Sequence, residues 1–195
     1  MRQAKGAGNA LWEFSLKVYQ EPEVENACLL MQDKLDIDIN MLLTCLWLGV
    51  SGRGRLNEAE LNDLTQQVAF WQEEIIQPMR QVRRRLKDLS KVGGEEFTQL
   101  RKSVSASELD AEQMEQQMLY QALQHRLANE ELSQVQRLSD TIHNLFLLLA
   151  RDGSMEYGWN RSVAILLDAC FPTATRGQIL DVLGAVTSAD VEVTG

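Results

Sequence analysis

Ile39-Asn-Met-Leu-Leu-Thr-Cys-Leu-Trp-Leu-Gly-Val50 is the most continuously apolar segment of the chain, and it decides the fold class. Leu and Met dominate it rather than Val, Thr and Tyr, which favours a helix over a strand. Asp36 or Asp38 can cap its start, and the glycine-rich run Gly49-Val-Ser-Gly-Arg-Gly54 ends it. A helix that is apolar on every side either spans a membrane or lies inside a bundle.

About a dozen residues are too few for a bilayer, which needs roughly 20. We therefore expect a buried central helix near residues 39–50. A strand is the alternative, because Ile37, Ile39 and Met41 alternate with Asp38 and Asn40.

Length and composition describe an ordinary globular chain. The 195 residues suit one domain with a sizeable core, and 45% are hydrophobic and 24% charged. The net charge of −9 argues against a general binder of nucleic acid or anionic membranes, because neutralising phosphates needs a cationic surface. We expect a flexible N-terminus at 1–9, a single helical domain at 10–188 and a loose tail at 189–195.

Cysteine usage and the apolar runs indicate a cytoplasmic protein. Cys28, Cys45 and Cys170 form an odd set without metal-like spacing, and each lies among apolar residues as a small buried hydrophobe does. No apolar h-region follows the first residues, so we expect no secretory signal. The other dense apolar run, Leu145–Ala150, is too short to span a membrane.

Apolar spacing predicts an all-α bundle of about seven to eight helices. The longest elements form a helical hairpin, at about 57–90 and 105–128, which packs on the buried apolar helix and is joined through Gly93-Gly94. The other helices are expected at Leu11–Gln20, Val24–Leu35, 129–149, Ser162–Phe171 and Thr175–Val186.

The first hairpin helix carries a capping box of Asn57 and Glu60. Proline inside a helix removes a hydrogen bond and clashes with the preceding turn, so Pro78 predicts a kink or break near Gln77. Apolar residues recur in steps of three and four and predict one seam. The seam consists of Leu61, Leu64, Val68, Trp71, Ile75, Met79, Val82, Leu86 and Leu89.

The second hairpin helix is expected to start near Ser105 or Ser107, after a short connector, with Glu108 near its N-terminus. Its sequence predicts an apolar stripe and an opposite polar face. The stripe comprises Ala111, Met114, Met118 and Ala122, and the polar face comprises Glu108, Glu112, Glu115, Gln116 and Gln124.

Arg80, Arg83, Arg84, Arg85 and Lys87 form the strongest charge cluster. Guanidinium groups hold phosphates and carboxylates bidentately, so one interpretation is a site for an anion or an acidic partner. The other interpretation is structural, because the hairpin brings glutamates of the second helix alongside. The candidate binding residues are Arg80, Arg83, Arg84, Lys87, Trp71 and Glu112.

Catalytic and metal motifs are weak or missing. Glu112-x-x-Glu115 and Asp140-x-x-His143 do not match the paired Glu-x-x-His of di-metal bundles, and there is no nucleophile elbow, P-loop or dinucleotide fingerprint. Gly52-Arg-Gly-Arg55 fits a linker. We expect no catalytic residue, metal or cofactor. The four tryptophans, Trp12, Trp47, Trp71 and Trp159, fit plain core, or the wall of a pocket for an apolar ligand.

Four segments resemble a family of small bacterial proteins catalogued only as a domain of unknown function. They are Leu11–Tyr19, Val24–Asp33, Asp38–Leu48 and Trp71–Lys87, and the resemblance covers roughly residues 10–150. The resemblance implies a compact helical protein, and it does not indicate an activity. We expect a non-enzymatic interaction or adaptor protein that binds another protein. The alternative is a helical binder or converter of an apolar or anionic small molecule.

Overall fold

The structure is a computed structural model and describes residues 8–151 and 159–193. These residues form eight α-helices and no strand, so the all-α prediction is confirmed and the strand alternative for residues 39–50 is wrong. The elements are α1 (Ala10–Tyr19), α2 (Val24–Leu35), α3 (Ile39–Val50), α4 (Glu58–Trp71), the π-helical turn η1 (Gln72–Ile76), α5 (Gln77–Ala122), α6 (Gln134–Arg151), α7 (Trp159–Cys170) and α8 (Arg176–Val193).

Helix α3 forms the centre of the body, and every residue from Ile39 to Gly49 is buried. Asp38 caps it, because its Oδ1 accepts hydrogen bonds from the backbone N–H groups of Asn40 and Met41 at 2.8 and 3.4 Å. Helix α6 packs most closely on α3. At the crossing, a Cβ added to Gly49 would lie 2.5 Å from the Cα of Thr141, so only glycine allows this approach.

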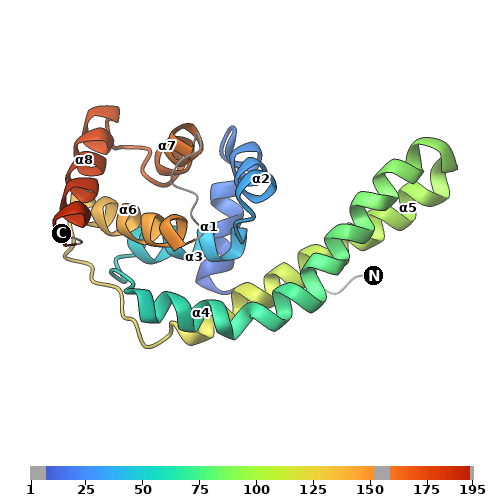
Figure 1. The fold of residues 1–195 in the computed structure, drawn as a ribbon, viewed down its shortest axis with the longest axis horizontal. Coiled ribbons are helices and arrows are strands. Elements are labelled where there is room, and N and C mark those ends of the chain that lie inside the picture. Colours follow the sequence, from blue (N-terminus) through green and yellow to red (C-terminus); the bar gives the residue numbers. More distant parts are fainter. Residues whose placement is uncertain (1–7, 152–158, 194–195) are drawn as a thin grey trace.

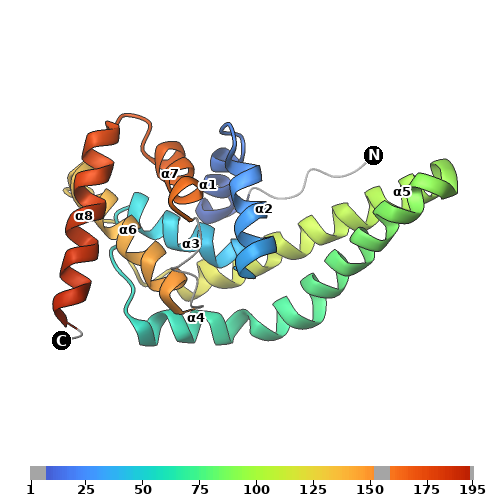
Figure 2. The ribbon, with the colours of Figure 1, turned by 45° about the horizontal axis from the view of Figure 1, so that its top comes forward.

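Helix α5 is a hairpin rather than one straight helix. Gly94 has φ 78° and ψ −162°, a backbone conformation that glycine adopts without strain, and the chain reverses there. We call residues 77–122 the arm, with an outgoing helix (77–93) and a returning helix (95–122). Figures 1 and 2 show the arm leaving the body formed by α1, α2, α3, α6, α7 and α8 and extending well beyond it.

The returning helix starts directly after Gly94, so the predicted connector up to Ser105 is wrong. No proline or glycine interrupts residues 95–104. The hydroxyls of Thr98 and Ser107 donate to the carbonyls of Gly94 and Ser103, at 3.3 and 3.2 Å, and so sit inside the helix rather than capping a new one. The helix also ends at Ala122, earlier than the predicted residue 128.

The predicted apolar seam is correct as far as Val68 and shifts beyond it. The N–H of Gln77 donates to the carbonyl of Gln72 across the π-helical turn η1, which lies just before Pro78. The helix therefore continues with one wider turn in place of a break near Gln77. Because such a turn holds an extra residue, it rotates every later side chain about the helix axis.

From the end of η1 onwards, the buried positions move by one residue at Ile76 and Arg80, whereas Leu86 is buried as the seam predicted. Among the described side chains of the outgoing helix and the end of η1, the buried ones are Ile76, Arg80 and Leu86. Val82 and Leu89, which the sequence pattern placed in the seam, are 47% and 48% exposed. The arm therefore buries arginine and presents apolar residues to solvent over part of its length.

Two smaller boundaries also differ from the sequence-based expectation. Helix α6 begins at Gln134, because Ser133 and Gln136 form reciprocal capping bonds, with the Ser133 N–H donating to Gln136 Oε1 at 2.9 Å. Helix α8 continues to Val193, into the segment predicted as a loose tail, since residues 185–194 contain neither glycine nor proline. Of the predicted flexible segment 1–9, residues 1–7 lie outside the described residues. None of the described helices is long and apolar enough to cross a bilayer.

Candidate interaction site on the arm

Ion pairs join the two helices of the arm at its base. Arg80 is only 3% exposed, and its Nη2 donates to Glu112 Oε1 at 2.8 Å while its Nε lies 3.6 Å from Glu108 Oε1. Arg83 holds the same Glu108 with two hydrogen bonds, of 2.5 and 3.1 Å. The hydrogen bond to Glu108 is the main reason why the pKa of Arg83 is raised. Each buried cation therefore has an acidic partner.

A chain of buried polar side chains continues this base into the body. The Ser15 hydroxyl of α1 lies 2.9 Å from Gln116 Oε1, Gln116 Nε2 donates to Asn40 Oδ1 of α3 at 2.9 Å, and Asn40 Nδ2 donates to Glu115 Oε2 at 2.5 Å. All four residues are buried. Three elements far apart in sequence are thus held together by hydrogen bonds. We call these residues, with Asp38, Arg80, Arg83, Glu108 and Glu112, the base cluster.

Buried Glu115 and partly exposed Asp38 form a carboxyl pair in the base cluster. Burial, and then the negative charge of Asp38, raises the pKa of Glu115 to about 9. Burial also raises the pKa of Asp38, opposed by its hydrogen bonds. Glu115 Oε1 accepts no hydrogen bond from any residue that the structure describes, and an interaction links its side chain to Asp38. Burial and the neighbouring carboxylate therefore both favour the protonated form of Glu115.

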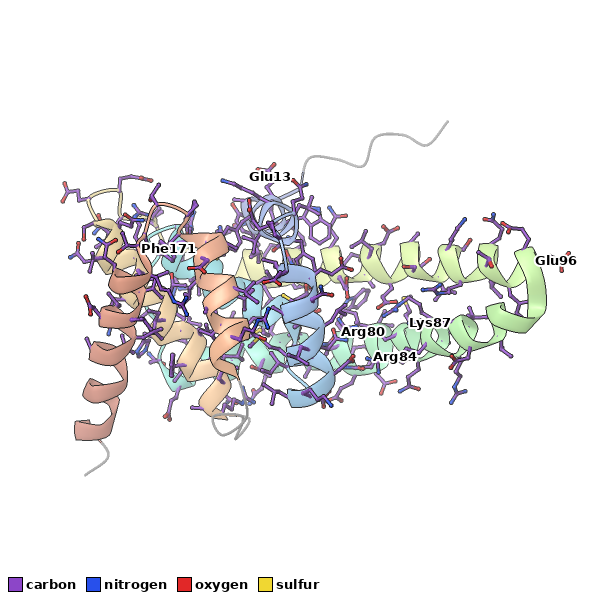
Figure 3. All side chains as sticks on the ribbon, turned by 90° about the horizontal axis from the view of Figure 1, so that it is seen from above. Glu13, Arg80, Arg84, Lys87, Glu96 and Phe171 are labelled. Carbon is purple, nitrogen blue, oxygen red and sulfur yellow. The ribbon has the colours of Figure 1, made fainter. Side chains whose placement is uncertain are left out.

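The structure brings only some of the sequence-predicted site residues together. Arg80, Arg83 and Glu112 meet in the base cluster, whereas Arg84 points away from it and pairs with Asp33 of α2 at 2.7 Å, with both side chains more than half exposed. Lys87 is exposed one turn farther out; Figure 3 shows Arg80, Arg84 and Lys87 along the arm.

Trp71 is a contact between helices rather than an open aromatic surface. Its Nε1 donates to the carbonyl of Ala111 at 2.9 Å and ties α4 to the returning helix. Trp47 is buried against Tyr120, with ring centroids 5.6 Å apart, and Trp12 lines a pocket described below. The side chain of Trp159 lies outside what the structure describes.

The predicted polar face of the returning helix is wrong for most of its members. Glu108, Glu115 and Gln116 are buried, whereas Met114, predicted in the apolar stripe, is 56% exposed. The reason is the base cluster, which supplies a hydrogen-bonding partner for each of these polar groups. Ser15, Asp38 and Asn40 were not singled out as site residues. The signal that could have identified this cluster is the polar side chain of Asn40 in a helix that is otherwise mostly apolar.

A pocket of about 400 Å³ lies beside the base cluster, between α1, α2, α3 and the arm. Trp12, Leu16 and Leu29 contribute to an apolar wall. Its charged lining comprises Glu25, Glu108, Glu112, Arg80 and Arg83. Both guanidinium groups are already paired with glutamates. The pocket therefore suits a neutral or cationic apolar molecule better than an anion.

The other sequence motifs make contacts within the protein. The Arg53 guanidinium of the Gly52–Arg55 loop lies 4.8 Å from the ring centroid of Trp47, and Gly52 O accepts from the Asn129 N–H at 2.9 Å. His143 Nε2 lies 3.0 Å from Leu56 O. Across residues 8–151 and 159–193, no three His, Cys, Asp or Glu side chains are grouped closely enough to hold a metal ion.

The outer part of the arm differs from its base in charge and exposure. We call residues 84–104 the distal arm. It contains six Lys or Arg residues and three Asp or Glu residues, a formal charge of +3 in a chain whose net charge is −9. Leu89, Phe97 and Leu100 are exposed there. Figure 3 shows this part of the arm away from the body helices. A basic and partly apolar projection therefore extends from an acidic body.

The family model described as "Protein of unknown function (DUF2390)" matches residues 10–119. The chain belongs to the DUF2390 family. The predicted family resemblance is confirmed over that segment, which includes α1 to α4, most of the arm and the entire base cluster. The DUF2390 segment ends before α6, short of the predicted residue 150. No curated protein and no solved structure matches the chain.

Proposed function

We propose that this DUF2390 protein is a non-enzymatic interaction protein that contacts another protein through its arm. The observation that carries the proposal is the exposed side chains of Leu89, Phe97 and Leu100 on a basic distal arm. Exposed apolar side chains grouped among polar ones are typical of protein–protein contact surfaces.

The base cluster supports the same proposal. An isolated helical hairpin is marginally stable in water, so an arm needs an anchor if it is to present a defined surface. Arg80 and Arg83 join the two helices, and Asn40 bonds the returning helix to α3. These bonds hold the arm in one direction relative to the body. The arginines therefore contribute to the contact by positioning the arm.

Affinity capture with the full chain as bait tests this proposal. We expect Phe97→Ser with Leu100→Ser to reduce partner capture at least about tenfold, because two exposed apolar contacts are lost. The control is Leu180→Ser, which removes a leucine on α8 that is 58% exposed, against 53% for Leu100. Both variants should unfold at the wild-type temperature. Undiminished capture by the arm variant would contradict the proposal.

We infer a second candidate function, a small-molecule binder, from the pocket beside the base cluster. Its volume of about 400 Å³ lies within the range of ligand sites. Native mass spectrometry of protein purified from its host tests it. A bound molecule that is lost in Leu109→Trp, which narrows the pocket, supports this function; wild-type protein at its bare sequence mass, even under gentle ionisation, speaks against it.

A further inference from the structure

One exposed stripe runs along α4, η1 and the outgoing helix, opposite the buried side of the same helices. It consists of Phe70, Glu74, Pro78, Val82, Arg85 and Leu89, all exposed. Phe70 is 72% exposed, the most of the three large apolar residues in the stripe. Consecutive members are three or four residues apart, so they share one side of the helix. Figure 2 shows α4 and the outgoing helix along one edge of the molecule.

The two halves of this helical run have opposite charge. Between residues 58 and 77 there are five Asp or Glu residues and no Lys or Arg. Between residues 78 and 91 there are six Lys or Arg residues and one Asp. The change of sign falls at Pro78, directly after the π-helical turn. Arg80 is buried, so the exposed charges of the stripe are Glu74 of η1 in its acidic half and Arg85 of the outgoing helix in its basic half.

A surface with one acidic and one basic half is complementary to itself when turned around. A twofold axis between residues 79 and 80 pairs two copies antiparallel. It places Glu74 opposite Arg85 of the other copy and Phe70 opposite Leu89. Parallel pairing would instead place like charges opposite each other. Twofold dimers with such isologous contacts are the commonest oligomers, and opposite charges across a contact set its register.

We propose that the stripe is a homodimer surface, with a second copy of this chain as its occupant. This inference rests on the proposed function, because the arm supplies half of the surface. A partner that is only acidic, such as a nucleic acid, would be attracted to Arg85 and repelled by Glu74. A second copy brings both charges in the reversed order and matches both halves. It also covers Phe70, Val82 and Leu89 together.

Sedimentation equilibrium on the full chain tests this inference through a charge swap. Glu74→Arg and Arg85→Glu each place like charges opposite each other twice per dimer, so each should weaken dimerisation at least about tenfold. The double variant Glu74→Arg with Arg85→Glu restores opposite charges and should regain wild-type dimerisation. Asp181→Arg, an exposed charge reversal on α8, is the matched control and should dimerise normally.

Three results would overturn the inference. The first is wild-type protein that stays monomeric up to about 100 µM, far above the dissociation constants of stable dimers. The second is a dimer that both single variants leave intact, and the third is a double variant that stays as weak as the singles. Monomeric protein whose arm still captures a different, acidic protein would remove the second copy as occupant and leave the proposed function standing. Circular dichroism confirms that every variant is folded.

Discussion

Helix α3 and the base of the arm are equally well buried, but by different means. Leu42, Leu46 and Leu48 of α3 are inaccessible because apolar neighbours surround them. Arg80 and Glu115 are also inaccessible, and charge pairs and hydrogen bonds surround them. Apolar burial tolerates many neighbours, whereas a buried charge needs one particular partner. The base of the arm is therefore specific in geometry and sensitive to single changes.

The difference extends along the arm itself. Its base is connected to α1 and α3, while the distal arm has exposed Phe97 and Leu100. A single helical run thus changes from buried core to exposed surface within a few turns. The π-helical turn makes this possible, because it moves Arg80 into the interior and Val82 to the surface. The structural role of the base and the proposed interaction role of the distal arm are therefore separated by position on the same helices.

The largest effect is expected at Arg80. Arg80→Ala leaves Glu112 without its cation and leaves Glu108 with Arg83 alone, and breaking a buried pair in this way costs about 3–5 kcal/mol. Urea unfolding at neutral pH measures the free energy of unfolding. A loss below about 1 kcal/mol, the value typical of an exposed pair, would show that the base cluster is not part of the core.

The α3–α6 crossing should respond to a single methyl group. Gly49→Ala places Cβ within 2.5 Å of the Thr141 backbone, which forces the helices apart and costs about 1–3 kcal/mol or more. Gly184→Ala on α8 is the matched control, because nothing lies within 4 Å of its added Cβ. That control should raise stability by up to about 1 kcal/mol through helix propensity. Equal unfolding temperatures for the two variants would contradict the close crossing.

Glu115 should make stability depend on pH in a defined direction. Its pKa is raised from about 4.5 in the unfolded chain to about 9 in the folded state. Its contribution to the free energy of unfolding is therefore complete below pH 4.5 and is lost as pH rises towards 9. Glu115→Gln stays neutral at every pH and keeps an oxygen to accept from Asn40. We expect the variant to be close to wild type in stability at pH 5 and clearly more stable than wild type at pH 8.

Urea unfolding at the two pH values measures this difference. Burial raises the pKa of Asp38 and of Glu112 as well, so wild-type stability keeps part of its slope in the variant. Glu96→Gln, an exposed glutamate at the tip of the arm, is the control and should follow wild type. A variant that is less stable than wild type at pH 8 would mean that Glu115 is ionised there.

The smallest effect is expected at Arg84, one turn from Arg80. Its pair with Asp33 is more than half exposed on both sides, and such pairs contribute about 0–1 kcal/mol. The free energy of unfolding of the Arg84→Ala variant should therefore lie within about 1 kcal/mol of the wild-type value. This difference should vanish in high salt. A loss as large as that of Arg80→Ala would remove the distinction between core and surface arginines.

The body and the hairpin turn were predictable because local signals agree with the packing. Residues 39–50 are apolar on every side, Asp38 caps them, and Asn57 and Glu60 form the predicted capping box. Gly94 reverses the chain within the predicted Gly93-Gly94 turn. In each case the residues that determine the structure are neighbours in sequence, so their pattern is sufficient.

The base cluster was not predictable in the same way. Asn40 bonds Glu115 and Ser15 bonds Gln116, each across more than 70 positions of sequence, and the periodicity of one helix says nothing about such partners. The π-helical turn was not predictable either. The apolar spacing of Leu61, Leu64 and Val68 continues in the sequence beyond the turn, but the extra residue in the turn rotates the later side chains to a different side of the helix. Amphipathic spacing therefore placed Val82 and Leu89 on the wrong side of the arm.

Native-state hydrogen exchange tests most directly the claim that the base of the arm belongs to the core and the distal arm does not. We expect backbone amides of residues 76–83 and 108–116 to exchange only through global unfolding, as those of α3 do. Amides of residues 86–101 should exchange faster, through local opening of the outer hairpin. Base amides that exchange as fast as those of the tip, or equal protection along the whole arm, would contradict this account.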